Sequence, residues 1–138
     1  NRLEECVREN QDTEFLFFLP PYSIVWWDDA YEKGLLDTYL YTLEQCMMRL
    51  LPYENVRFYT TEFNEASTIT DLYQYMDYMH GSVPVTERMA QTVGTAEDEI
   101  TLENYREELA KLKEVFLQFR SRVESEGYGF VYEGAMTE

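Results

Sequence analysis

The sequence predicts an α/β domain in which helices flank parallel strands and a long helix lies near the C-terminus. Three segments carry this prediction: a continuous apolar run at residues 15–19, an amphipathic segment at 31–51, and an alternating run at 56–61 that favours β-structure. A strand, a long helix and a second strand in this order form a right-handed crossover unit. We therefore expect the two strands to be parallel neighbours.

The first elements are a short helix and an apolar strand. Leu3, Cys6 and Val7 have helical spacing, and the polar residues 11–14 end that helix. The next run, Phe-Leu-Phe-Phe-Leu at 15–19, is apolar on both faces and stops at two prolines. Such a run suits the central strand of a sheet that helices cover on both sides.

The strongest helical pattern lies between residues 31 and 51. We expect Asp28 and Asp29 to cap this helix, and Pro52 closes it. Apolar side chains recur at spacings of three and four, which places them on one helical face. They are Leu35, Leu36, Tyr39, Leu40, Leu43, Cys46, Met47, Leu50 and Leu51.

The remainder of the chain predicts two more helices. Pro84 favours the first turn of a helix that runs to Val93, and residues 94–99 form an acidic linker. The last helix spans residues 102–123, and its apolar stripe packs on its own domain or forms a coiled-coil contact with a second copy of the chain. The stripe consists of Leu102, Tyr105, Leu109, Leu112, Phe116, Phe119 and Val123.

Length and composition fit one folded domain followed by a tail. The chain has 138 residues, and an aromatic content of 16% argues against disorder despite the high charge. We assign residues 1–125 to the domain and 126–138 to the tail, in which Tyr128, Phe130 and Tyr132 alternate as in a short strand. The two cysteines permit at most one disulfide and do not suit a zinc cluster, so no metal or cofactor is expected.

The charge balance excludes several classes of partner. Eleven basic and 27 acidic side chains give a net charge of −16. Nucleic acid selects for basic faces, so it is not expected as a partner, and an anionic membrane surface is disfavoured for the same reason. No apolar run approaches the roughly 18 residues of a membrane span. A membrane contact would therefore need an N-terminal segment that is absent here.

The single histidine, His80, follows Asp77 by three residues. Imidazole changes charge near neutral pH, and a nearby carboxylate fixes its tautomer and stabilises the imidazolium. The pair follows the last predicted strand, and ligands gather at the carboxyl ends of parallel strands. A lone histidine is otherwise a surface or structural group. On the catalytic interpretation, His80 is a general base and Asp77 orients it.

Several motifs in order resemble the closing block of SGNH (GDSL-type) hydrolases. A Pro-Pro-Tyr-Ser element at 20–23 follows the first strand, a Tyr-x-Asp-x-x-His block ends at His80, and residues 100–105 open the terminal helix. The closer likeness, over residues 15–119, is to the SGNH-like proteins of bacterial cell-envelope and capsule gene clusters, relatives of the D-alanyl transfer protein of lipoteichoic acid synthesis. The resemblance implies a flavodoxin-like three-layer fold, of which this chain is the C-terminal half.

The resemblance also implies a serine esterase or acyltransferase that acts on an acylated envelope glycan or a similar ester. Such a protein would be extracytoplasmic and membrane-anchored. Its serine belongs to a Gly-Asp-Ser element that this sequence lacks, as it lacks the oxyanion donors. The serines at 23, 67, 82, 121 and 125 have no glycine-flanked turn between a strand and a helix. We therefore expect the nucleophile in a missing N-terminal half.

Residues after the first strand are the candidate substrate-binding groups. Tyr22 and Trp26 stack on a sugar ring beside the site or, alternatively, pack over the sheet edge. Ser23 is the nearest substitute for the missing nucleophile. The alternative to an enzyme is a non-catalytic acidic module that binds a protein, or an inhibitor that mimics nucleic acid. That alternative predicts carboxylates concentrated on one face of the molecule.

Overall fold

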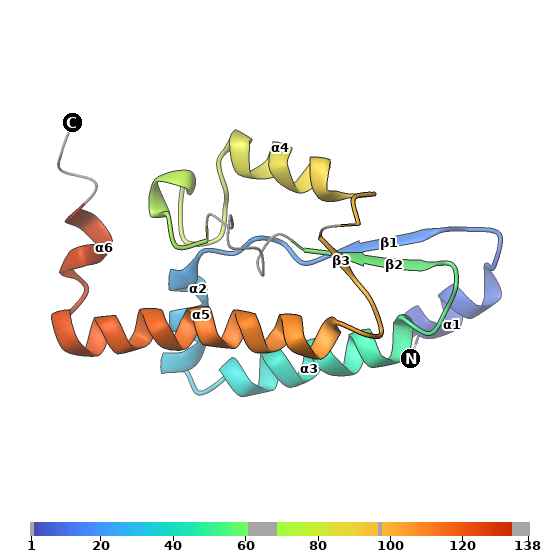
Figure 1. Ribbon diagram of the computed structural model, residues 1–138, viewed down its shortest axis with the longest axis horizontal. Helices are drawn as coiled ribbons and strands as arrows, with labels where there is room; N and C mark the ends of the chain where they lie inside the picture. The colour runs from blue at the N-terminus through green and yellow to red at the C-terminus, as the bar shows by residue number, and fades with distance from the viewer. Residues whose placement is uncertain (1, 61–68, 97, 134–138) are drawn as a thin grey trace.

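The computed structural model describes residues 2–60, 69–96 and 98–133, and it confirms a mixed α/β fold with a long C-terminal helix (Figure 1). In chain order the elements are α1 (Arg2–Glu9), β1 (Phe15–Phe18), α2 (Ile24–Glu32), α3 (Leu36–Leu50), β2 (Val56–Tyr59), the 3-10 helix η1 (Leu72–Gln74), α4 (Val83–Thr92), β3 (Glu99–Ile100), α5 (Tyr105–Glu126) and α6 (Gly129–Glu133).

A three-stranded sheet with the order β1-β2-β3 lies between the helices. β1 and β2 are parallel, with Phe15 opposite Val56 and Phe18 opposite Tyr59, so the predicted parallel pairing is confirmed. β3 pairs with β2 in the antiparallel sense. The sequence had assigned its first residue, Glu99, to a linker, because a two-residue strand has no periodicity to detect.

β1 forms one edge of the sheet in the described part of the chain, so the prediction of a covered central strand is wrong there. Its side chains alternate: Phe15 and Phe17 pack against the core, whereas Leu16 and Phe18 are 47% and 48% exposed. Alternation follows from the pleat, which sends successive side chains to opposite faces. An apolar run does not reveal whether anything covers the second face.

Two helices occupy the stretch before β2, where the sequence predicted one. α2 ends near Lys33, and α3 begins after a turn at Gly34, whose φ of +69° is a backbone conformation that favours glycine. Asp28 and Asp29 lie inside α2 and do not cap a helix. The pattern from residue 31 onward missed α2 because its apolar residues, Ile24 to Trp27, are consecutive and show no spacing.

Two helices cover one side of the sheet. Figure 1 shows α3 and α5 side by side below it, whereas α4 lies on the other side near the carboxyl ends of β1 and β2. The apolar stripe of α5 packs on its own domain, since most of its residues are buried in the core with Val7, Ile24, Met47 and Val56. The buried stripe residues are Tyr105, Leu109, Leu112, Phe116 and Val123.

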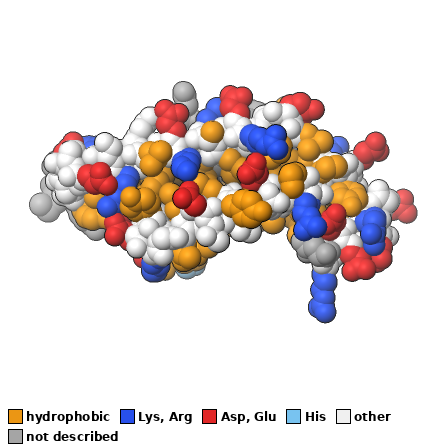
Figure 2. Space-filling view, turned by 90° about the horizontal axis from the view of Figure 1, so that it is seen from below, with side chains coloured by type: hydrophobic (Ala, Val, Ile, Leu, Met, Phe, Trp, Pro, Cys, Tyr) orange, Lys and Arg blue, Asp and Glu red, His pale blue; other side chains and the backbone are white. Residues whose placement is uncertain are grey.

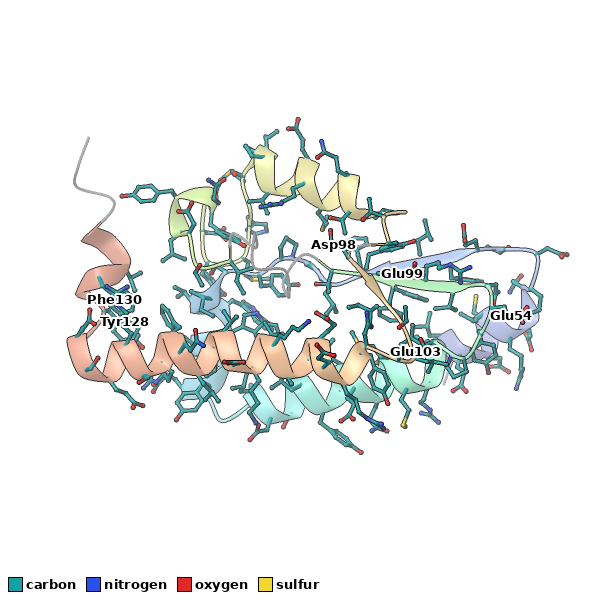
Figure 3. All side chains as sticks on the ribbon, in the orientation of Figure 1. Glu54, Asp98, Glu99, Glu103, Tyr128 and Phe130 are labelled. Atoms are coloured by element: carbon teal, nitrogen blue, oxygen red, sulfur yellow. The ribbon has the colours of Figure 1, made fainter. Side chains whose placement is uncertain are left out.

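The chain after α5 folds back as the helix α6, so the short strand suggested by alternation at its aromatic residues is wrong. Phe130 contacts Phe119 of α5 with ring centroids 5.7 Å apart, and the guanidinium of Arg122 lies 4.0 Å from the centre of the Phe130 ring. Figure 3 shows Tyr128 and Phe130 beside the end of α5. Phe130 of α6 therefore packs on the end of α5.

Candidate functional site

A closed loop between η1 and α4 holds the candidate catalytic pair. Its ends are joined by an antiparallel bridge between Tyr75 and Gly81, and the amide of Met76 donates to the carbonyl of His80 at 2.8 Å. The amide of Ser82 donates to the carbonyl of Gln74 at 2.7 Å. We refer to residues 75–81 as the His80 loop. These backbone bonds fix its path before any side chain contributes.

Asp77 and His80 contact each other within this loop. The Nδ1 atom of His80 lies 2.6 Å from Oδ2 of Asp77. The other carboxylate oxygen, Oδ1, accepts hydrogen bonds of 2.8 Å from the backbone amides of Met79 and His80. The hydrogen bond with His80, followed by these two amides, lowers the pKa of Asp77 to about 2. The carboxylate is therefore ionised and held in one orientation at neutral pH.

The geometry assigns separate roles to the two ring nitrogens of His80. A carboxylate beside Nδ1 favours the tautomer that carries its proton on Nδ1, which leaves the Nε2 lone pair free to accept a proton. The imidazole side chain is 68% exposed, and among the described residues Nε2 has no hydrogen-bond partner. The pair is thus an oriented proton acceptor that is open to solvent.

Ser23 is not hydrogen-bonded to His80. It is fully buried at the start of α2, and its hydroxyl donates to the backbone carbonyl of Tyr78 at 2.6 Å. That bond ties Ser23 to the His80 loop but occupies the proton that a nucleophile would have to release to a base. In the parts of the chain that are described, no serine hydroxyl is hydrogen-bonded to the imidazole, and Ser67 lies outside them.

Tyr22 and Trp26 belong to an aromatic group. Their rings stack with centroids 4.6 Å apart, and Trp26 also stacks on Tyr39 of α3 at 5.4 Å. Trp27 meets the Trp26 ring edge-on at 4.9 Å. The group borders a cavity of about 250 Å³, which we call the aromatic cavity. It is lined by Leu19, Pro20, Tyr22, Trp26, Trp27, Tyr39, Thr42 and Leu43.

Two hydrogen bonds connect Pro21 and Ser23, the neighbours of Tyr22, to the His80 loop. Besides the Ser23 bond to Tyr78, the phenol of Tyr75 donates to the backbone carbonyl of Pro21 at 2.7 Å. The segment that follows β1 and the loop that contains His80 are therefore fastened together. Both follow the carboxyl ends of the parallel strands, the edge at which α/β sheets bind ligands.

A buried ionic cluster outside this region was not predicted from the sequence. The carboxylate of Asp28, which is 4% exposed, accepts from Arg120 at 3.0 Å and from the phenol of Tyr128 at 2.5 Å. Arg120 also lies 2.7 Å from Glu32. The bond to Asp28 is the main reason why the pKa values of Arg120 and Tyr128 are raised. Helical spacing could have indicated the buried position of Asp28, because Asp28 follows the buried Ile24 by four residues and so lies on the same helical face.

The charges on the face of α3 and α5 are mixed in sign. Figure 2 shows Asp and Glu side chains there interspersed with Lys, Arg and apolar groups. Ion pairs cross between the two helices, from Arg106 to Glu44 at 3.3 Å and from Lys113 to Asp37 at 3.1 Å. A surface that imitates nucleic acid would carry unpaired carboxylates in a regular row, and this face does not have that form.

Other classes of site find little support in the described residues. No group of three or more His, Cys, Asp or Glu side chains there is arranged to hold a metal ion, and Cys6 and Cys46 are free thiols. None of the helices in the same residues combines the length and apolar character needed to cross a membrane. The chain matches no family model, no curated protein and no solved structure.

Proposed function

We propose that this chain supplies the base half of a serine esterase or acyltransferase of the SGNH type. In this proposal His80 takes the proton from a serine hydroxyl through Nε2, and Asp77 holds the ring and stabilises the imidazolium that forms. The observation that carries the proposal is the 2.6 Å contact between Nδ1 and Oδ2, with the rest of the ring exposed. The substrate class, acyl esters of bacterial envelope polysaccharide, comes from the family resemblance.

The chemistry requires a serine from outside the described residues. After His80 removes its proton, the serine oxygen attacks the ester carbonyl and forms a tetrahedral intermediate. His80 then returns the proton to the departing alcohol, and water or a second alcohol releases the acyl group by the same steps in reverse. Ser23 is excluded from this role in the proposal because its hydroxyl is buried and donates to Tyr78.

Two features of the fold support the SGNH assignment. β1 and β2 are parallel, as the strands of that fold are, and the Pro-Pro-Tyr-Ser element directly follows β1. The His80 loop contacts that element through the Tyr75 and Ser23 hydrogen bonds. The pair therefore lies at the sheet edge where α/β enzymes assemble their sites from successive loops.

The test is the reaction of a fluorophosphonate probe with the full-length natural protein that includes this chain. We expect a serine to be labelled, and His80→Ala to slow labelling by about 10²–10⁴-fold, the range for a general base. Asp77→Asn should slow it within the same range, because an amide no longer selects the tautomer. Peptide mapping of the labelled protein would identify the nucleophile.

Asp71→Asn is the matched control for Asp77→Asn. Asp71 caps η1 by accepting from the amide of Tyr73 at 3.2 Å, and an asparagine oxygen can keep that bond. We expect this variant to be labelled at the unaltered rate. Equal labelling of the His80→Ala variant and the parent protein, with both folded, would overturn the proposed role of His80.

A further inference from the structure

We propose that the aromatic cavity binds an acyl chain. The identification of that chain as part of an ester substrate rests on the proposed function, whereas the binding itself does not. The cavity is a half-open pocket between the segment that follows β1 and the helices α2 and α3. Figure 1 shows α2 and the loop before α4 at the same end of the sheet.

The wall of the cavity is almost entirely apolar. Leu19, Pro20 and Leu43 have no polar side-chain atoms, and the aromatic residues present ring carbons. The hydroxyl of Thr42 already donates to the backbone carbonyl of Thr38 at 2.7 Å. A sugar ring carries a hydroxyl on nearly every carbon and loses water contacts that this wall cannot replace. An alkyl chain forms no hydrogen bonds with water, so it loses none when it enters the cavity.

The size of the cavity also suits a chain of several carbons. An apolar cavity of about 150 Å³ already admits benzene. The aromatic cavity, at about 250 Å³, has room for a longer group.

The position of the cavity fits an ester whose carbonyl reaches the His80 loop. The Tyr22 side of the wall is fastened to this loop through Ser23 and Tyr78.

Binding can be measured with neutral methyl esters, because the net charge of −16 would repel fatty-acid anions. Trp26 and Trp27 are the two tryptophans of the chain and both line the cavity, so their fluorescence reports occupancy directly. From methyl butanoate to methyl octanoate we expect the affinity to rise about four-fold with each methylene that enters the cavity. Methyl glucoside should leave the fluorescence unchanged.

The variant Thr42→Phe, with Thr86→Phe as its control, makes the test specific. Both threonines are exposed, lie on helices, and donate to a carbonyl four residues earlier, but Thr86 is on α4 and does not line the cavity. A phenyl group at residue 42 should displace about two methylenes and weaken methyl octanoate binding about fifteen-fold. The same change at residue 86 should leave the affinity as it is.

The proposal is overturned if affinity does not depend on chain length, if both phenylalanine variants bind alike, or if methyl glucoside binds more tightly than the esters. The variant His80→Ala separates this proposal from the proposed function. It should bind the esters like the parent chain, since His80 does not line the cavity. Length-dependent binding without fluorophosphonate labelling would reject the esterase and keep the cavity, and the reverse result would reject the cavity alone.

Discussion

The hydroxyl of Ser23 donates a 2.6 Å hydrogen bond to the main-chain carbonyl of Tyr78, which lies 55 residues further along the chain. This bond joins the first residue before α2 to the loop that presents Asp77 and His80. The position of the candidate pair is thereby linked to the end of β1 and to the aromatic cavity. Contacts of this kind turn two separate sequence motifs into neighbours.

Replacement of Ser23 by alanine should destabilise the protein. The Tyr78 carbonyl would lose its donor in a partly buried position, at a cost of about 1–3 kcal/mol in the free energy of unfolding. Chemical denaturation would measure the loss. Ser121 is exposed on α5, so Ser121→Ala should change the stability by less than about 0.5 kcal/mol. Complete loss of fluorophosphonate labelling in a folded Ser23→Ala variant would instead identify Ser23 as the nucleophile.

The carboxyl group of Asp77 should titrate well below an ordinary aspartate. Its pKa is lowered from 3.8 to about 2, first by the hydrogen bond with His80 and then by two backbone amides. Carboxyl carbon shifts followed by NMR during an acid titration would give the midpoint directly. In His80→Ala the midpoint should rise towards 3.8 but stay below it, because the amides remain.

The same shift fixes the direction of a stability change. Folding lowers this pKa, so the pair adds stability above pH 3.8 and loses that contribution as the pH falls towards 2. The effect is small because both side chains are exposed. A midpoint near 3.8 in the parent protein would contradict the contact between Nδ1 and Oδ2.

Replacing Arg120 should destabilise the protein far more than replacing Tyr128, although both residues contact Asp28. Removing the charge in Arg120→Met leaves a buried carboxylate without its cation and should cost about 3–5 kcal/mol. Tyr128→Phe removes a hydroxyl that donates to Asp28 and accepts from Arg120, but this tyrosine is 43% exposed, so a loss of about 1 kcal/mol is expected. Tyr41→Phe, at a tyrosine 62% exposed, is the control and should be neutral. Equal losses for Arg120→Met and Tyr128→Phe would show that Asp28 does not depend on the ion pair.

The cluster also predicts a loss of stability in alkali. Asp28 raises the pKa of Tyr128 above 10.0 in the folded protein. The contribution of Tyr128 is therefore complete below pH 10 and disappears as the pH rises through the raised value. Thermal denaturation between pH 8 and 11 should show a steeper decline for the parent protein than for Tyr128→Phe. Parallel curves would contradict this prediction.

The sequence predicted the elements that have strong local patterns. The parallel pairing of β1 and β2, the helix α4 after Ser82 and the stripe on α5 all follow from spacing and turn residues. The contact of Asp77 with His80 was also predictable, because a separation of three residues brings side chains together in a closed turn. Such features depend on residues that are close in the chain.

The features that the sequence did not predict depend on distant residues. No local pattern around Asp28 indicates its hydrogen bond with Tyr128, which lies one hundred residues later in the chain. The edge position of β1 depends on which segments pair with it, and the pattern of the strand itself is the same in either case. The aromatic cavity needs Tyr39 of α3 beside Trp26 of α2, and the turn at Gly34 that brings them together was not recognised.

Gly34→Ala should therefore destabilise the turn between α2 and α3. An alanine side chain would meet no atom within 4 Å, so the cost arises only from the φ of +69° and should be about 1–2 kcal/mol. Gly129→Ala is the matched control, since a methyl group there also meets nothing and α6 needs no positive φ. It should be neutral or stabilise by about 0.4–1 kcal/mol. The reverse order of the two variants in a denaturation experiment would contradict the turn conformation.

Gly81, which follows His80, leaves room for a buried valine of α4. A Cβ atom at residue 81 would lie 2.7 Å from Cγ1 of Val85 and 2.9 Å from its Cβ, closer than such atoms approach in proteins. Gly81→Ala should therefore push the His80 loop away from α4. We expect a loss of about 1–3 kcal/mol in stability and slower fluorophosphonate labelling.

A second substitution tests whether this contact is the cause. Val85→Ala removes the 2.7 Å contact with Cγ1 but keeps the 2.9 Å contact with Cβ, so it relieves the clash in part. The double variant should lose less stability than the sum of the losses in the two single variants, with an interaction energy of at least about 0.5 kcal/mol. The labelling rate should recover in part in the same variant, since the loop can return part of the way towards α4. Strict additivity in the denaturation cycle would mean that Gly81 acts through the backbone alone.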